Sequence, residues 1–113
     1  MSELFESASL ILQIIGKIQV KIFGISIDTF ISINAKVIER TSHQENISLL
    51  VRSYKNGRYG GLLFNASFPQ TKLPGDIGTV GSRLKIEGVV SSKSKDLKSG
   101  ERIYKLEQCQ WMF

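Results

Sequence analysis

The stretch FISINAKV, residues 30–37, places an aliphatic side chain at every second position. The aliphatic set is Ile31, Ile33, Ala35 and Val37, and the alternate set is Phe30, Ser32, Asn34 and Lys36. Because successive side chains of a β-strand point to opposite faces, this period of two predicts a strand with one buried face and one face in water. We expect that strand to span residues 26–39.

A second isoleucine-rich segment precedes it. Ile18, Val20 and Ile22 alternate with polar neighbours, so we expect a strand over about residues 10–23, with Gly16 and Gly24 at bends or turns. A helix that begins near residue 9 is the alternative, because LILQIIGKI also fits a helical stripe. Residues 1–8 are interpreted as a short lead-in.

Three further strands are predicted over residues 47–54, 83–90 and 103–112. The segment LLFNASF, residues 62–68, fits either a short strand or a helical turn. Polar residues 40–46 and 55–61 are expected to form turns, and Asn56-Gly57 favours a type I′ hairpin turn. Both prolines and three of the ten glycines lie in residues 69–81, which predicts a connection across the surface.

Five or six antiparallel strands with scarcely any helix predict an all-β protein, a small closed or nearly closed barrel. Closure protects the edges of such a sheet. The 113 residues suffice for a single domain, which we place at residues 9–113 after the lead-in.

The composition points to an anionic partner. Fifteen basic residues against ten acidic ones give a formal charge of +5, which favours nucleic acid or an anionic surface. One cysteine excludes an internal disulfide, and Glu3 and Glu6 stand where a signal peptide needs positive charge. No apolar run approaches the roughly 18 residues of a spanning helix. We therefore expect a cytoplasmic protein with no membrane partner.

Nothing in the sequence indicates an enzyme. The one histidine, His43, lies in a polar turn, and the one cysteine, Cys109, lies in a predicted strand. Metal sites usually need three or four closely spaced ligands, and phosphate loops need a GxxxxGK[ST] spacing; neither pattern occurs. We expect no catalytic residues, no metal and no cofactor.

Cations and aromatic residues alternate on the water-facing positions of the predicted strands. Single-stranded nucleic acid requires this mixture, because phosphates need cations and unpaired bases stack on aromatic rings. The loop 91–102 adds lysines that could close over a bound strand; from residue 93 to residue 105, five basic residues oppose two acidic ones. The candidate nucleic-acid-binding residues are Lys17, Lys21, Phe30, Lys36, Arg52, Tyr54, Lys55, Arg58, Tyr59, Lys85, Lys93, Lys95, Lys98 and Arg102.

Several segments resemble the bacterial and phage single-stranded DNA-binding proteins of the OB-fold class. GSRLKIEGVV (81–90) followed by SGERIY (99–104) is similar to the family's fourth strand and the charged loop after it. GISIDTFISINAKV (24–37) is similar to its glycine-led second strand with a Thr-Phe pair, and LLVRSYKN (49–56) takes the place of its third strand.

The resemblance implies an OB-fold that binds single-stranded DNA along one face with little sequence preference, in DNA replication, recombination or repair. It also implies a homodimer or homotetramer, which the apolar surface of the isoleucine-rich first third favours independently. Tyr54 stands where many members have tryptophan, and residues 69–81 leave little room for the usual helix. The sequence ends at WMF without the family's acidic tail, which favours a phage, plasmid or primosomal relative.

Two functions stay open on this evidence. The first is binding of single-stranded DNA, with RNA as an open possibility. The second is an OB-type domain for protein–protein assembly, in which the charge only keeps the protein soluble. Binding to nucleic acid must weaken steeply as salt rises, which separates the two.

Overall fold

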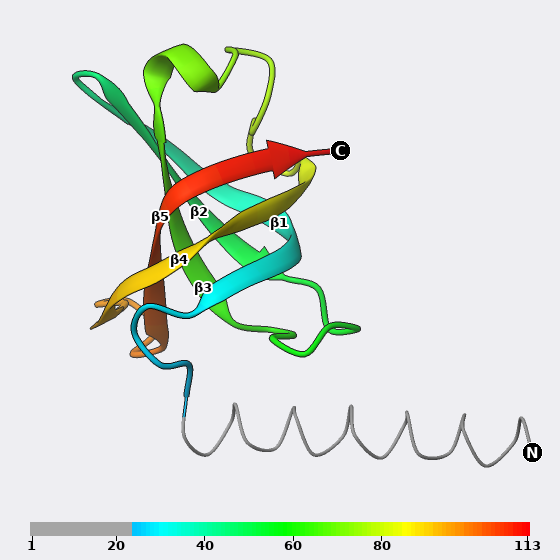
Figure 1. Ribbon diagram of the computed structural model, residues 1–113, viewed down its shortest axis with the longest axis vertical. Helices are drawn as coiled ribbons and strands as arrows, with labels where there is room; N and C mark the ends of the chain where they lie inside the picture. The colour runs from blue at the N-terminus through cyan, green and yellow to red at the C-terminus, as the bar shows by residue number, and fades with distance from the viewer. Residues whose placement is uncertain (1–23) are drawn as a thin grey trace, which may run out of the picture.

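The computed structural model describes residues 24–113, which form five strands around one core (Figure 1). The strands are β1 (Phe30–His43), β2 (Asn46–Ser53), β3 (Leu63–Pro69), β4 (Arg83–Lys95) and β5 (Arg102–Met112). They close into a barrel in the order β1-β2-β3-β5-β4, and a single 3-10 turn, η1 (Gln70–Lys72), follows β3. The all-β barrel of OB type is confirmed. One pairing differs from the prediction, since β3 and β5 run parallel.

The predicted lead-in 1–8 and the predicted strand 10–23 lie outside the described residues. The isoleucine-rich surface that motivates an oligomer lies largely there as well. Oligomerisation therefore stays a prediction.

The period-two pattern correctly identifies the core. All four aliphatic residues of the opening stretch are buried, and Ile47, Leu49 and Val51 of β2 meet them inside the barrel. The remaining centre is filled by Phe64, Phe68, Ile86, Tyr104 and Leu106. Phe30, by contrast, is 63% exposed at the start of β1. The alternate positions of β1 are thus free to form an outer, functional face.

Strand β1 pairs with two partners because it bends around the barrel. Its first half, residues 30–36, pairs with β4, and its second half, residues 35–43, pairs with β2. A register shift between Val37 and Glu39 marks the bend, as expected of a β-bulge. Lys36 lies in the overlap, opposite Arg83 on one side and Arg52 on the other.

The predicted bounds of this strand are wrong by four residues at each end. Asp28 has a left-handed backbone with a φ of +69°, and its N–H donates to the Val90 carbonyl, so residues 26–29 form a turn. At the other end the polar residues 40–43 continue the ladder, and only Gln44 and Glu45 separate the strands. The predicted turn 40–46 shrinks accordingly.

The segment 62–68 is a strand, which resolves the two alternatives, and η1 is the only helical turn among residues 24–113. The connection that follows covers one end of the barrel. Leu73 and Ile77 are buried there, and the Trp111 indole N–H donates to the Lys72 carbonyl at 2.9 Å. The connection's only helical element among the described residues is the three-residue turn η1.

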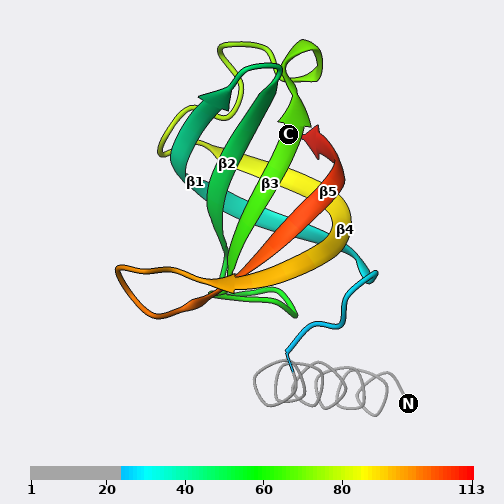
Figure 2. The same ribbon diagram turned by 90° about the vertical axis from the view of Figure 1, so that its left-hand side faces the viewer.

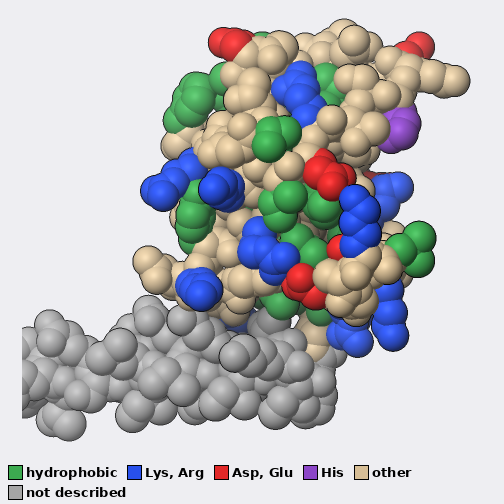
Figure 3. Space-filling view, turned by 180° about the vertical axis from the view of Figure 1, so that it is seen from behind, with side chains coloured by type: hydrophobic (Ala, Val, Ile, Leu, Met, Phe, Trp, Pro, Cys, Tyr) green, Lys and Arg blue, Asp and Glu red, His purple; other side chains and the backbone are tan. Residues whose placement is uncertain are grey.

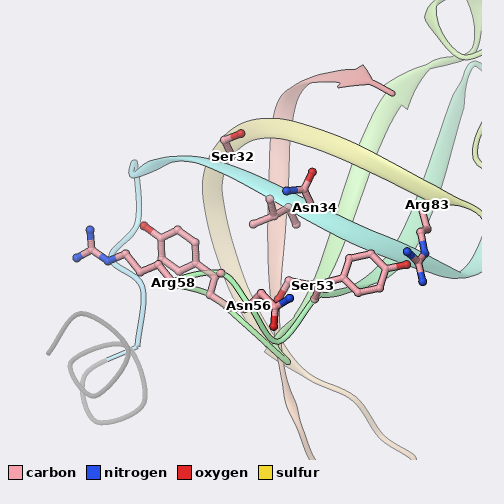
Figure 4. Close-up of a pocket in the computed structure, with 10 residues that line it drawn as sticks. Ser32, Asn34, Ser53, Asn56, Arg58 and Arg83 are labelled. Carbon is pink, nitrogen blue, oxygen red and sulfur yellow. Dashed lines mark hydrogen bonds between the residues drawn. The ribbon is translucent and has the colours of Figure 1, made fainter. Parts of the chain in front are cut away.

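The turn after β2 does not take the predicted type I′ form. That turn type needs positive φ at both central residues, and neither Asn56 nor Gly57 has it. Instead the chain closes at Gly61, whose φ is +80° and whose N–H donates to the Ser53 carbonyl. The turn is therefore wider, and Asn56 and Arg58 both lie at the edge of a groove (Figure 4).

The lysine-rich loop is shorter than predicted. Strand β4 continues to Lys95 and β5 begins at Arg102, so the loop spans 96–101 and not 91–102. Two backbone bonds close its tip, from Asp96 N–H to the Glu101 carbonyl and from Gly100 N–H to the Asp96 carbonyl. Figure 2 shows the resulting hairpin, in orange, extending beyond the barrel. Residues 92–95 pair with the first residues of β5, and residues 103–105 of β5 pair with β3 on their other side.

Candidate nucleic-acid interface

Tyr54, directly after β2, lies on the outer face of the first half of β1. Its backbone N–H donates to the Asn34 carbonyl at 2.9 Å, which fixes the residue beside a water-facing position of β1. The half-buried ring lies under Arg83, whose guanidinium carbon is 4.8 Å from the ring centroid. This distance is well within the range of a cation–π contact.

Three adjoining grooves share Tyr54 as a common wall. The first, of about 410 Å³, is lined chiefly by Ser32, Asn34, Asn56, Arg58, Tyr59 and Arg83 (Figure 4). The second, of about 760 Å³, is lined by Lys36, Arg52, Lys55, Asn56 and Val80 among others. The third, of about 250 Å³, adds Lys85 and Phe113 beside Asn34 and Arg83.

The charge in these grooves has one sign. Six basic residues line them and no acidic residue does; the six are Lys36, Arg52, Lys55, Arg58, Arg83 and Lys85. Cross-strand register concentrates the charge further, because Lys36 stands directly opposite both Arg52 and Arg83. Like charges in directly opposed positions destabilise a sheet. A bound anion would relieve that repulsion.

Arg52 is the exception, since a carboxylate neutralises it. Its guanidinium makes two bonds to the Glu101 carboxylate at 2.9 and 3.0 Å and donates to the Gly61 carbonyl at 2.9 Å. The hydrogen bonds with Arg52 hold the pKa of Glu101 below its ordinary value and raise the pKa of Arg52. Arg52 therefore ties β2 to the loop that joins β4 and β5. Neither Lys36 nor Arg83 has a carboxylate partner within residues 24–113.

The first groove is polar between two charged ends. Arg58 and Arg83 lie at opposite ends of it, and Asn34 and Asn56 lie between them (Figure 4). Arg58 stands over Tyr59 at 5.8 Å from the ring centroid, a looser version of the pair at the other end. The amide side chains of Asn34 and Asn56 form no hydrogen bond with the described part of the chain. They are available to a ligand.

Seven of the predicted binding residues come together here: Lys36, Arg52, Tyr54, Lys55, Arg58, Tyr59 and Lys85. Phe30 is exposed on the same side of β1, but it lies opposite Val89 and lines none of the three grooves. Lys17 and Lys21 lie outside the described residues.

The other predicted cations form a second surface on the β4–β5 hairpin. We call Lys93, Lys95 and Lys98 the hairpin lysines; they are exposed, as is Arg102. Lys93 also lies 5.8 Å from the Tyr104 ring centroid, and Arg102 lies against Gly24. Figure 3 shows basic side chains interspersed with acidic ones over this part of the back of the molecule. The hairpin and the turn after β2 leave the same end of the barrel (Figures 1 and 2).

Several groove residues were not among the candidates, and four of them carry a polar, charged or aromatic side chain that the proposed site uses: Asn34, Asn56, Arg83 and Phe113. Asn34 and Arg83 stand at the water-facing positions of predicted strands, so the alternation could have identified both. Asn56 and Phe113 carry no such signal, because one lies in a turn and the other follows the last strand. Phe113 is 90% exposed and packs edge-on against Trp111, with ring centroids 5.4 Å apart.

Two other reactive side chains, those of His43 and Cys109, line none of the three grooves. His43 is exposed at the end of β1, and Cys109 is buried in β5, where desolvation raises the pKa of the thiol to about 11. Within residues 24–113 no group of three or more His, Cys, Asp or Glu side chains could hold a metal ion. No helix in the same range has the length and hydropathy needed to cross a membrane.

Comparison with known proteins finds no matching family model, no similar curated protein and no similar solved structure.

Proposed function

We propose that this protein binds single-stranded nucleic acid, DNA in the first instance, in the three grooves around Tyr54. It does so without catalysis and with little sequence preference. One observation carries the proposal: the grooves are lined by six basic residues, three aromatic rings and no acidic residue. The rings belong to Tyr54, Tyr59 and Phe113. Cations suit phosphates, and flat groups suit unpaired bases.

The geometry favours single strands over duplex. The grooves lie at different sides of Tyr54 and include side chains that can meet the face or edge of a base. In a duplex those faces are stacked and the pairing edges are occupied, so contact falls mainly on the phosphates and sugars. Duplex would then bind chiefly through charge and lose the stacking contribution of about 1–3 kcal/mol per base.

The hairpin lysines supply a second, phosphate-following contact. Lysine is a flexible point charge and needs no fixed geometry, in contrast to the planar fork of arginine. Because the hairpin leaves the barrel at the same end as the turn after β2, a strand in the grooves can continue toward it (Figure 2). The Arg52–Glu101 pair anchors the loop that carries Lys98 to the barrel for this contact.

An OB-type assembly domain is the alternative, and one feature favours it. Val80 is 66% exposed at the second groove, which the half-buried Ile38 also lines. An acidic protein segment with apolar residues could use this groove. Such a domain would show no affinity for oligonucleotides at moderate salt.

The test is a fluorescence anisotropy titration with labelled oligo-dT, oligo-U and duplex of about 12 nucleotides, within the range of OB-fold site sizes. We expect tighter binding of single strands than of duplex, and a steep loss of affinity between about 50 and 200 mM salt. Tyr54→Ala should weaken oligo-dT binding by about 1–3 kcal/mol. Lys72→Ala, outside the grooves, is the control. Equal affinity for single strand and duplex would contradict the proposal.

A further inference from the structure

Arg83 presents an exposed, flat guanidinium at one end of the first groove. It is an exposed residue at the start of β4, and its guanidinium lies over the Tyr54 ring. We propose that a nucleobase stacks on the outer plane of the Arg83 guanidinium, and that Tyr54 is the support that holds this plane in position. This inference rests on the proposed function and names the residue that forms its stacking surface.

The state of Tyr54 argues against direct stacking on its ring. Arg83 already occupies a position over the ring, at 4.8 Å from the centroid. The phenol oxygen Oη is fully buried and has no hydrogen-bond partner in the described structure. Tyr54 is thus embedded at its polar end and covered by a cation.

Arginine has the properties that this role requires. Its guanidinium is planar and delocalised, it is weakly hydrated, and it stacks on aromatic faces. Unpaired bases are known to stack on arginine planes as well as on aromatic rings. The in-plane N–H groups of Arg83 have no carboxylate partner among residues 24–113, so they can still meet a phosphate.

The surroundings fit a base better than a simple anion. The amides of Asn34 and Asn56 lie between the arginine ends of the groove and lack partners in the described chain. An amide offers one acceptor and two donors, which match the edge of a base. A site for phosphate alone would have no use for acceptor oxygens beside the cation.

The experiment separates the plane of Arg83 from its charge. We compare Arg83→Lys, which keeps the charge, with Arg83→Ala by oligo-dT anisotropy over a salt series. The proposal predicts that both variants lose at least about 5-fold in affinity, since the stack is lost in both. The slope of log K against log salt should stay unchanged in Arg83→Lys and flatten by about 0.7 in Arg83→Ala.

Support by Tyr54 is tested in the same assay. Tyr54→Phe keeps the ring and should bind as the wild type does, whereas Tyr54→Ala should lose as much as Arg83→Lys. Arg40→Lys, whose side chain lines none of the three grooves and donates to the Ile77 carbonyl, controls for the arginine-to-lysine change and should leave affinity unchanged. Thermal unfolding of each variant confirms that it is folded.

Two outcomes would overturn the inference while the proposed function stands. Wild-type affinity in Arg83→Lys would mean that Arg83 contributes only charge. Tighter binding by Arg83→Ala would mean that Arg83 shields the Tyr54 ring and that the base stacks on the ring itself. If the wild type binds no single strand at all, the proposed function and the inference fail together.

Discussion

Neutralising Lys36 should stabilise the free protein and weaken its binding to nucleic acid. Lys36 stands directly opposite Arg52 and Arg83 on neighbouring strands. Glu101 neutralises Arg52, so the repulsion that counts is the one with Arg83. Two charged side chains that face each other on neighbouring strands change the stability of a sheet by roughly 0.2–1 kcal/mol. We therefore expect Lys36→Gln to stabilise the fold by about 0.5 kcal/mol at low salt, a rise of about 2–4 °C in melting temperature.

The same substitution removes one phosphate contact. We expect the slope of log K against log salt for oligo-dT to flatten by about 0.7, with lower affinity at low salt. Thermal unfolding followed by circular dichroism, and anisotropy on the same samples, measure both effects. The gain in stability should disappear at about 1 M salt, where the Debye length is about 3 Å.

Lys72→Gln is the matched control, because Lys72 lies in η1 and lines none of the three grooves. Its backbone carbonyl, and not its side chain, accepts the bond from Trp111. It should change neither the melting temperature nor the salt slope appreciably. A lower melting temperature in Lys36→Gln, together with unchanged oligo-dT binding, would refute the reasoning.

Three further predictions concern the hairpin and the thiol. Changing the hairpin lysines together to alanine should lower affinity for all sequences alike and flatten the salt slope by about 2, and an unchanged slope would reduce them to a solvated surface. Glu101 has a pKa below its ordinary 4.5, so its ion pair contributes fully above that pH and is lost as pH falls through the lowered value. The difference in melting temperature between wild type and Glu101→Gln should therefore vanish in acid, and a constant difference would contradict it. Cys109, with a pKa near 11, should resist a thiol reagent at pH 8 until the protein unfolds, and rapid labelling of folded protein would count against its burial.

The core could be predicted from sequence because a strand's side-chain period is fixed by its backbone. In β1 and β2 the alternation correctly identifies the buried aliphatic residues, which are Ile31, Ile33, Ala35, Val37, Ile47, Leu49 and Val51. The ends of β1 could not be found that way. At its first end, the left-handed backbone of Asp28 delays the start of the strand. At its other end, the polar residues 40–43 continue to pair with β2. Neither feature produces a pattern of apolar residues in the sequence.

The hairpin shows the same limit. Residues 91–95 look like a loop because they are serine and lysine, but four of these five side chains are exposed and need not be apolar for the strand to continue. It pairs through its backbone, with Ser92 opposite Lys105 and Lys95 opposite Arg102. Composition alone therefore underestimates the length of β4.

The candidate site was partly predictable for a related reason. Lys36 and Lys85 were found as water-facing residues of alternating strands, and Tyr54 as the aromatic beside a basic turn. Which charges remain free depends on tertiary register: the neutralisation of Arg52 by Glu101 joins residues 49 positions apart. The contact of Arg83 with Tyr54 likewise arises only when β1 brings β2 and β4 together.

The most direct test of the account is to map where a single strand lies on the protein. Backbone amide NMR spectra recorded during titration with oligo-dT report this residue by residue. We predict that the largest shift changes fall on residues 32–36, 52–59 and 83–85 around the three grooves, with smaller changes along the hairpin. The amides of β3 and η1 should move little. Changes concentrated on β3 and η1, with the residues around Tyr54 unaffected, would contradict the central claim.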